Sequence, residues 1–210
     1  MKTDTPTNLH NMFTDKVIII TGSTQGIGLV TAEMLIHRGA RLVINSRSHE
    51  KVEKALFYLR KITPNVIGLA GDVSNYEFCL DLRNYVMEEF GRIDILINNA
   101  GVASSGLMKE IVPNAFEKVV QINLLGSIYP TLACINDIRQ QKGSILFISS
   151  VAGIVGLPKY SAYSATKRAI VSLAESIRCE LTDDGVFVGI NYPGFTENED
   201  HKTTLNAKGE

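Results

Sequence analysis

Two short stretches between residues 149 and 167 carry side chains suited to acid–base chemistry. The pair Ser149 and Ser150 precedes a helical pattern in which Tyr163 and Lys167 stand four positions apart. This spacing places both side chains on one face of a helix, about 6 Å apart along its axis. An ammonium group favours the phenolate, so we expect Lys167 to lower the pKa of Tyr163. Taken alone, the pair also fits an ordinary surface helix. Whether it is part of a reaction site depends on the other motifs of the chain.

A glycine-rich turn follows the first apolar run of the chain. Residues 16–21 form a short β-branched run, typical of a strand buried on both faces. The sequence TGSTQGIG at 21–28 then leads into a helical pattern that ends near residue 39. Strand, glycine turn and helix N-terminus together favour binding of a dinucleotide pyrophosphate over a plain connecting turn. The candidate contacts in this turn are Gly22, Ser23, Gln25, Gly26, Ile27 and Gly28.

The second apolar run, at 41–47, ends in Ser46 and Arg47. An NAD-preferring site of this type places a carboxylate near this strand end to accept from the ribose 2′-hydroxyl. Here no carboxylate repels a 2′-phosphate, and Arg47 offers a charge-assisted partner for it. The sequence therefore predicts NADP rather than NAD; the alternative is a solvated arginine.

The remaining pattern alternates strands and helices. Apolar runs at 66–70, 93–97, 144–149 and 186–191 follow helical patterns at 50–62, 75–90, 114–138 and 160–181. This alternation predicts an α/β fold, a doubly wound, Rossmann-like parallel sheet of six strands between two helical layers. We expect one domain over 15–195, a polar tail over 1–14, and a polar segment without a strand pattern over 196–210.

Composition narrows the class of protein. The 210 residues are 45% apolar and 20% charged with a net charge of −1, which points to no nucleic-acid or anionic-membrane partner. We find no signal-peptide core and no apolar run of about 18 residues. Cys79, Cys134 and Cys179 are scattered, as expected of reduced thiols in a cytoplasmic protein. The four histidines lack metal-ligand spacing, so we predict no metal site.

The ordered motifs together resemble the short-chain dehydrogenase/reductase family, in its single-domain branch. They are the glycine turn at 21–28, Asp72-Val73, the NNAG motif at 98–101, Asn123, Ser150, the Tyr163/Lys167 pair and Pro193-Gly194. The resemblance covers about residues 16–194. It implies hydride transfer between a nicotinamide cofactor and a carbonyl or secondary alcohol substrate.

The resemblance also implies roles. Tyr163 is the general acid or base, Lys167 lowers its pKa and binds the nicotinamide ribose, Ser150 binds the substrate oxygen, and Asn123 holds a relay water. Asp72 and Val73 flank the adenine, and Asn99 meets the adenosine side. The full cofactor-binding set that the resemblance implies comprises the six residues of the glycine turn together with Ser46, Arg47, Asp72, Val73, Asn99, Ala100, Gly101, Tyr163, Lys167, Pro193, Gly194 and Thr196. Asn123 is alternatively a helix-kinking residue, Ser149 and Ser150 are alternatively turn residues, and Asn98 is expected to tie adjacent strands together.

Two departures from the family pattern stand out. Asn198 occupies the position where the family usually has a threonine that contacts the nicotinamide carboxamide, and Thr196 is a second candidate for that contact. The chain also ends at Glu210, before the family's usual substrate loop and seventh strand, so we expect the edge of the sixth strand to be uncovered.

Two other functions remain open. Tyr160 stands seven positions before Lys167, the spacing used by enoyl (C=C) reductases of the same superfamily. A catalytically silent NADP-binding redox sensor is the alternative outside enzymes. Ile154, Val155, Leu157 and Phe195 favour a hydrophobic small-molecule substrate, although packing explains them equally well. The resemblance further implies a homodimer or homotetramer paired through the helices that hold Asn123 and Tyr163.

Overall fold

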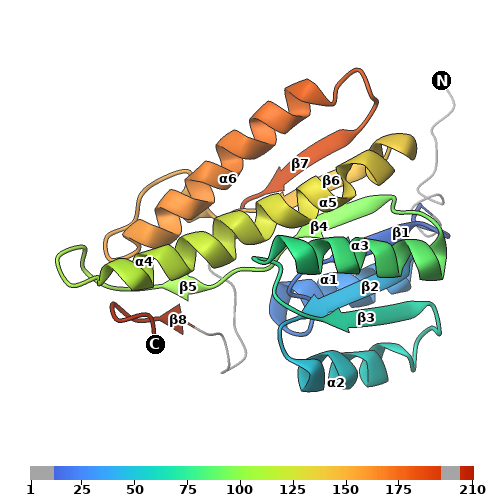
Figure 1. Cartoon of the computed structure of the whole chain (residues 1–210), viewed down its shortest axis with the longest axis horizontal. Coiled ribbons are helices and arrows are strands. Elements are labelled where there is room, and N and C mark those ends of the chain that lie inside the picture. The colour runs from blue at the N-terminus through green and yellow to red at the C-terminus, as the bar shows by residue number, and fades with distance from the viewer. Residues whose placement is uncertain (1–11, 195–203) are drawn as a thin grey trace, which may run out of the picture.

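The computed structural model describes residues 12–194 and 204–210 and contains a six-stranded parallel sheet (Figure 1). The order across the sheet is β3-β2-β1-β4-β6-β7. The strands are β1 (Val17–Ile20), β2 (Arg41–Ser46), β3 (Val66–Ala70), β4 (Ile95–Asn98), β6 (Ser144–Ile148) and β7 (Phe187–Asn191). The predicted doubly wound sheet is confirmed. The strand order reverses between β1 and β4, which places the ligand-binding crevice of such a sheet at their carboxyl ends.

Helices cover both faces of the sheet. Helices α1 (Gly26–Ile36) and α2 (His49–Leu59) pack on one face, and α3 (Tyr76–Phe90), α5 (Gly126–Gln140) and α6 (Ser161–Glu180) pack on the other (Figure 1). Alternate residues of β1 divide between the two cores. Ile18 and Ile20 face α1 and α2, whereas Val17 and Ile19 face the other layer. All four are 0% exposed, which explains why the strand is continuously apolar.

The helix predicted over 114–138 is interrupted. The structure has α4 (Pro113–Val120), a π-helical turn at Gln121–Leu125, and then α5. Asn123 lies in the π-helical turn and is fully buried. A π-turn inserts one extra residue into the helix and re-aims its side chains. The hydrophobic period of the sequence does not reveal such an insertion, so only the structure shows it.

The C-terminal residues contain a strand that the sequence analysis did not predict. Strand β8 (Thr204–Leu205) pairs in parallel with β5 (Ala103–Ser104), a two-residue strand that was also missed. Leu205 is 5% exposed and packs with Val102, Val119 and Ala162. A two-residue strand carries too little alternation to be recognised from sequence, and its partner lies about a hundred positions away.

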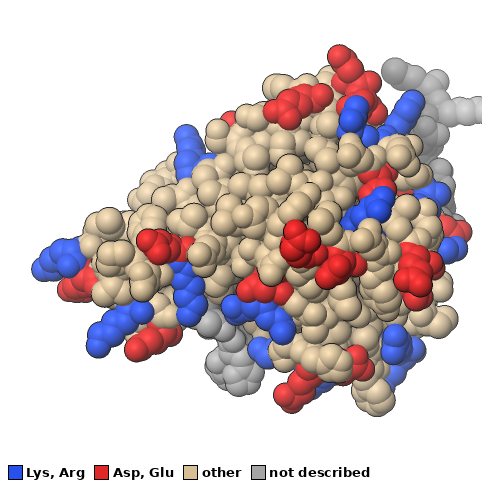
Figure 2. All heavy atoms as spheres, in the orientation of Figure 1, with Lys and Arg blue, Asp and Glu red and all other residues tan. Residues whose placement is uncertain are grey.

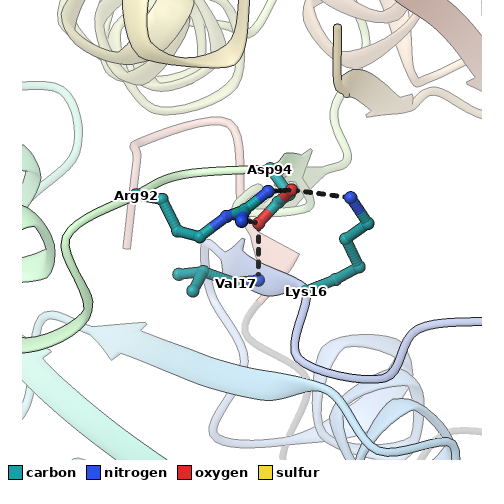
Figure 3. Close-up of polar contacts among 4 residues, drawn as sticks. All are labelled: Lys16, Val17, Arg92 and Asp94. Carbon is teal, nitrogen blue, oxygen red and sulfur yellow. Dashed lines mark hydrogen bonds and ion pairs between the residues drawn. The ribbon is translucent and has the colours of Figure 1, made fainter. Parts of the chain in front are cut away.

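A buried ionic cluster joins β1 to the residues just before β4 (Figure 3). The Asp94 side chain is 1% exposed and accepts hydrogen bonds from Lys16 Nζ (2.9 Å), the Val17 N–H (3.0 Å) and Arg92 Nε (2.8 Å). Burial alone raises the pKa of Asp94, but the hydrogen bonds from Arg92, Val17 and Lys16 outweigh it and hold the pKa below its usual value. The cluster ties the two central strands together at the edge opposite the strands' carboxyl ends.

The face of the molecule shown in Figure 2 carries interspersed charges of both signs, in keeping with the small net charge of the chain. Among the described residues, β7 pairs with β6 alone. Its outer edge is partly capped because Arg178 Nε donates to the Val188 carbonyl over 2.9 Å. Phe187 is 66% exposed there, and a cavity of about 690 Å³ runs along the edge. Its lining includes none of the candidate catalytic residues.

Taken together, α4, the π-helical turn and α5 span the 28 residues Pro113–Gln140, which contain an 18-residue window of mean hydropathy 1.2, of which 39% is buried. By length and composition this segment qualifies as a membrane-crossing candidate, a feature that the sequence analysis missed. A core helix meets the same criterion, and α5 packs against α3 and β4. We therefore interpret this segment as a packed helix of the α/β fold.

Candidate active site

The glycine turn between β1 and α1 has the backbone geometry of an anion-binding site. Gly22 and Gly26 have φ of +62° and +52°, the left-handed region that favours glycine. A Cβ on Gly28 would lie 2.6 Å from both the Gly22 carbonyl oxygen and Asn99 Nδ2, so only glycine fits there. The N-cap residue Gln25 makes no side-chain cap. The first N–H groups of α1 are therefore available to a pyrophosphate.

Ser23 and Asn45 brace this turn from beneath. The Ser23 hydroxyl donates to the Ile20 carbonyl over 2.6 Å and accepts from the Asn45 N–H, while the Ser23 N–H donates to the Asn45 carbonyl. Ser23 is 0% exposed. Its polar groups are used inside the fold, which gives Ser23 a bracing role; the predicted cofactor contact of Ser23 remains a prediction. Asn45 was missed, although a polar residue inside an otherwise apolar strand was a usable signal.

Thr21 and Asn99 connect the turn to the end of β4. The Asn99 amide donates to the carbonyls of Thr21 and Gly22, each over 2.9 Å, and the Thr21 hydroxyl accepts from the N–H groups of Asn99 and Ala100. A Cβ on Gly22 would lie 2.8 Å from the Ala100 Cα, so the two loops are in close contact. The structure thus gives the Asn99 amide group a positioning role; the predicted adenosine contact remains a prediction.

Ser46 and Arg47 lie where β2 ends. Ser46 is half-buried and its hydroxyl accepts from the Ser48 N–H, whereas Arg47 is exposed. Within residues 12–194 and 204–210, Arg47 makes no hydrogen bond or ion pair. Its guanidinium is therefore available to an external anion at the carboxyl edge of the sheet.

Asp72 and Val73 follow β3 at the same edge of the sheet. One Asp72 oxygen accepts from the N–H and the hydroxyl of Ser74, at 2.9 and 2.7 Å, which fixes the loop before α3. Val73 is 5% exposed and packs against the helix at Gly126. Asn98 donates to the Thr131 hydroxyl over 2.9 Å. It therefore ties β4 to α5, and the predicted link between adjacent strands is wrong for this side chain.

Ser150 and Tyr163 meet at the end of β6. A hydrogen bond joins their side chains, and the Ser150 hydroxyl also accepts from the Ala152 N–H. Burial raises the pKa of Tyr163, and the hydrogen bond with Ser150 acts in the opposite direction but does not overcome it. Ser149 is not equivalent, because its hydroxyl donates to the Lys167 carbonyl over 3.0 Å. The structure therefore supports the choice of Ser150 over Ser149.

Lys167 lies beside Tyr163 on α6, as their spacing predicts. Its ammonium is 5.7 Å from the centroid of the Tyr163 ring and donates to the Ile148 carbonyl over 2.8 Å. The prediction that the pKa of Tyr163 is lowered does not hold in this structure, because loss of solvation outweighs the favourable contacts. Spacing along a helix gives proximity, but it does not give the burial of the phenol.

Asn123 reaches the same centre from the π-helical turn. Its Oδ1 accepts from the Val102 N–H over 2.8 Å, and its Nδ2 donates to the Val102 carbonyl and to the Thr166 hydroxyl. A Cβ on Gly101 would lie 3.2 Å from Asn123 Oδ1 and 3.5 Å from Lys167 Nζ. The four candidate catalytic residues therefore converge from the π-turn, the end of β6 and α6. Thr166, which holds the Asn123 amide, was missed by the sequence analysis.

The last predicted contacts follow β7. The Pro193 carbonyl accepts from the Val151 N–H over 3.2 Å, and Gly194 is exposed. Thr196, Asn198 and Phe195 lie outside the described residues. Among the described residues, no group of three or more histidine, cysteine, aspartate or glutamate side chains is arranged to hold a metal ion.

Comparison with known proteins agrees with this geometry. A mouse protein named 3-ketodihydrosphingosine reductase is 34% identical over 196 residues, which is 89% of this chain and 59% of the relative. An Arabidopsis thaliana protein named 11-beta-hydroxysteroid dehydrogenase-like 2 is 35% identical over 89% of this chain and 61% of the relative. The chain thus spans about six tenths of the length of these two relatives. An uncharacterized oxidoreductase of Thermotoga maritima is 32% identical over 89% of this chain and 74% of the relative.

Solved structures show the same fold. A short-chain dehydrogenase/reductase from Burkholderia phymatum, crystallised with NAD, superimposes with a TM-score of 0.85 at 31% identity, covering 88% of this chain and 67% of that one. An NAD⁺-bound xylitol dehydrogenase gives 0.86 at 29% identity, covering 90% and 73%. The family described as short chain dehydrogenase matches residues 16–209. The parallel sheet, the glycine turn and the grouping of Ser150, Tyr163 and Lys167 agree with these comparisons. The chain therefore belongs to the short-chain dehydrogenase family of oxidoreductases.

Proposed function

We propose that the protein transfers a hydride between NADP(H) and a carbonyl or secondary alcohol substrate, with Tyr163 as the general acid or base. The observation that carries this proposal is the hydrogen bond between Tyr163 and Ser150, beside the Lys167 ammonium. The bound nicotinamide supplies or accepts the hydride. The names of the mouse and Arabidopsis relatives refer to a ketone and a hydroxysteroid, which agrees with this pair of substrate groups.

The residues of the chain supply orientation and the proton. Ser150 holds the substrate oxygen next to the Tyr163 hydroxyl, which donates its proton as the carbonyl is reduced and takes one back in the reverse direction. Burial raises the pKa of Tyr163 above its ordinary value, so the phenol is protonated at neutral pH and has a proton to donate. Lys167 binds the nicotinamide ribose, and Asn123 holds a water that links Lys167 to solvent in a proton relay. Turnover of NADPH with a panel of ketones and aldehydes, and of NADP⁺ with secondary alcohols, tests the proposal, and a silent redox sensor would turn over none of them.

The enoyl reductase alternative depends on Tyr160. Tyr160 is the N-cap residue of α6 and is half-buried. The hydrogen bond with Ser150 belongs to Tyr163 instead. We therefore favour carbonyl reduction, and the paired tyrosine variants described in the Discussion separate the two reactions.

The cofactor prediction concerns Arg47. Arg47→Leu is expected to raise the Kd for NADPH about 10-fold or more while the Kd for NADH changes less than about twofold, because hydrogen bonds to a charged phosphate are worth about 1.5–3 kcal/mol. Titration of cofactor fluorescence measures both constants. Arg60→Leu is the matched control, since Arg60 is an exposed arginine at the opposite end of α2.

The NADP preference is contradicted by tighter binding of NADH than of NADPH to the unmodified protein. The two solved neighbours described above contain NAD, so the comparison is informative for this chain in particular. If Arg47→Leu changes the Kd for NADPH and the Kd for NADH by the same factor, Arg47 does not bind the 2′-phosphate.

A second prediction concerns the pH dependence of alcohol oxidation. The hydrogen bond with Ser150 lowers the pKa of Tyr163, so Ser150→Ala is expected to raise it further. Oxidation needs the phenolate, and its rate rises as the pH passes the pKa of Tyr163. The ascending limb of kcat against pH, on which the rate rises as Tyr163 loses its proton, should therefore move to higher pH in Ser150→Ala. A limb that stays in place, or moves to lower pH, would contradict the assignment of Tyr163 as the base.

We also propose pairing of subunits through the helices that hold Asn123 and Tyr163, and a cytoplasmic location. Leu132 on α5 is 53% exposed, and Tyr129 packs edge-on against Tyr76 at 5.7 Å between ring centroids, so this surface presents apolar groups to a partner. Sedimentation of the purified protein measures whether it is a dimer or tetramer.

A further inference from the structure

Two loops beside the catalytic centre expose a group of apolar side chains, which we call the apolar rim. Leu107 and Met108 lie between β5 and α4, and Val151, Ile154 and Val155 lie between β6 and α6. Met108, Val155 and Ile154 are 66%, 62% and 55% exposed. Exposed apolar groups gathered at one place on a surface mark sites of binding more often than single exposed side chains do.

Two contacts hold the two loops together. The Gly106 N–H donates to the Lys159 carbonyl over 2.8 Å, which joins the first loop to the residues just before α6. The Ser161 hydroxyl lies 3.6 Å from the Met108 sulfur, which connects the first turn of α6 to the same loop. The beginnings of α4 and α6 lie at the same end of the molecule (Figure 1). The first loop therefore lies against the last residues of the second loop, where α6 begins.

The second loop is also held by its own hydrogen bonds. The Val155 N–H donates to the Val151 carbonyl over 3.1 Å, and Arg168 Nη1 donates to the Gly153 carbonyl over 3.1 Å. These bonds fix the backbone from which Ile154 and Val155 project. The two side chains remain exposed in a hydrogen-bonded loop, so a ligand meets a surface that is already in place.

The apolar rim is continuous with the catalytic centre. Val151 directly follows Ser150, which hydrogen-bonds Tyr163. Ser161, the neighbour of Met108, stands two residues before Tyr163 on α6. Both loops thus adjoin the residues that would hold the oxygen of the substrate.

We propose that the apolar rim binds the hydrocarbon portion of the substrate, so that the preferred substrates are ketones and secondary alcohols with long apolar chains. This inference rests on the proposed function. Met108 and Val155 are the specificity-determining residues, since they are the most exposed members of the two loops.

The test measures kcat/KM for a series of 2-alkanones from 2-butanone to 2-decanone, with NADPH and with NADH. Burial of each added methylene is expected to raise kcat/KM by about twofold to fourfold. The double variant Met108→Gln/Val155→Thr keeps the side-chain shapes but removes apolar surface. The fall in kcat/KM that this variant causes should grow with the chain length of the ketone, reaching about tenfold for 2-decanone.

The matched control is Met34→Gln/Val30→Thr on α1. Met34 and Val30 are 51% and 57% exposed, so the control makes the same two replacements at comparable exposure on another surface. It should leave the dependence on chain length unchanged.

The outcomes separate this inference from the proposed function. Turnover of 2-butanone with no rise along the series overturns the apolar rim and leaves the proposed function standing. A rise that persists in Met108→Gln/Val155→Thr places the hydrocarbon elsewhere and also overturns it. If the unmodified protein sediments as a larger species than Met108→Gln/Val155→Thr, a second copy of the chain covers the rim in place of the substrate, and the inference is overturned. No turnover of any ketone or alcohol with either cofactor overturns the proposed function itself.

Discussion

Replacing Tyr163 with phenylalanine is expected to lower kcat for carbonyl reduction by about 10²–10⁴-fold, the usual contribution of a general acid. The Kd for NADPH should change by less than about threefold, because the phenyl ring keeps its place on α6 and the glycine turn is untouched. Steady-state kinetics and fluorescence titration measure the two quantities. The expected separation of kcat from cofactor affinity distinguishes loss of the proton donor from loss of structure.

Tyr160→Phe is the control for this prediction. It removes the same hydroxyl three residues earlier, at the N-cap of α6, and should leave kcat within about threefold. If Tyr160→Phe abolishes activity and Tyr163→Phe does not, the enoyl reductase alternative is correct. Unchanged activity in both variants would show that neither tyrosine is the general acid.

Replacing Asp94 with asparagine is expected to reduce the free energy of unfolding by about 2–4 kcal/mol. The variant leaves the buried Val17 N–H and two cations without their carboxylate (Figure 3). The side chains of Lys16 and Arg92 are 41% and 40% exposed, so they can recover part of their hydration, which limits the loss. For a chain of this length the change corresponds to a fall in Tm of about 5–15 °C, measurable by thermal melting.

The same carboxylate predicts an acid-dependent loss of stability. The folded-state pKa of Asp94 lies below its unfolded value, so its contribution is complete above the unfolded pKa of about 4. That contribution is lost as the pH falls through the folded-state pKa. Melting curves taken from neutral pH downward should therefore converge for the unmodified protein and Asp94→Asn. Curves that stay parallel would contradict the assignment.

Asp184→Asn is the matched control for Asp94→Asn. Asp184 also accepts two hydrogen bonds from an arginine, Arg139, at 2.8 and 2.9 Å. The two side chains are 32% and 46% exposed, so water replaces the lost contact. A fall in Tm comparable to that of Asp94→Asn would show that burial is not the reason for the large effect.

Much of the sheet could be read from sequence because its signal is local. The run at 17–20 is buried on both faces, and its continuous apolarity predicts that directly. The Asn75 cap and the left-handed Gly91 that bound α3 are also local signals. The pairing of β5 with β8 is not local, because it joins two-residue strands far apart in the chain.

The residues of the candidate active site also fall into those with a local sequence signal and those without one. The glycine turn, the Tyr163/Lys167 pair and the position of Ser150 can be recognised in the sequence, since each is a fixed spacing of residue types. The tertiary structure was needed to show that the Asn123 amide is held by Val102 and Thr166, that Asn45 braces the turn, and that burial raises the pKa of Tyr163. Burial and hydrogen-bond partners depend on residues that meet only when helices and strands from distant parts of the chain pack together.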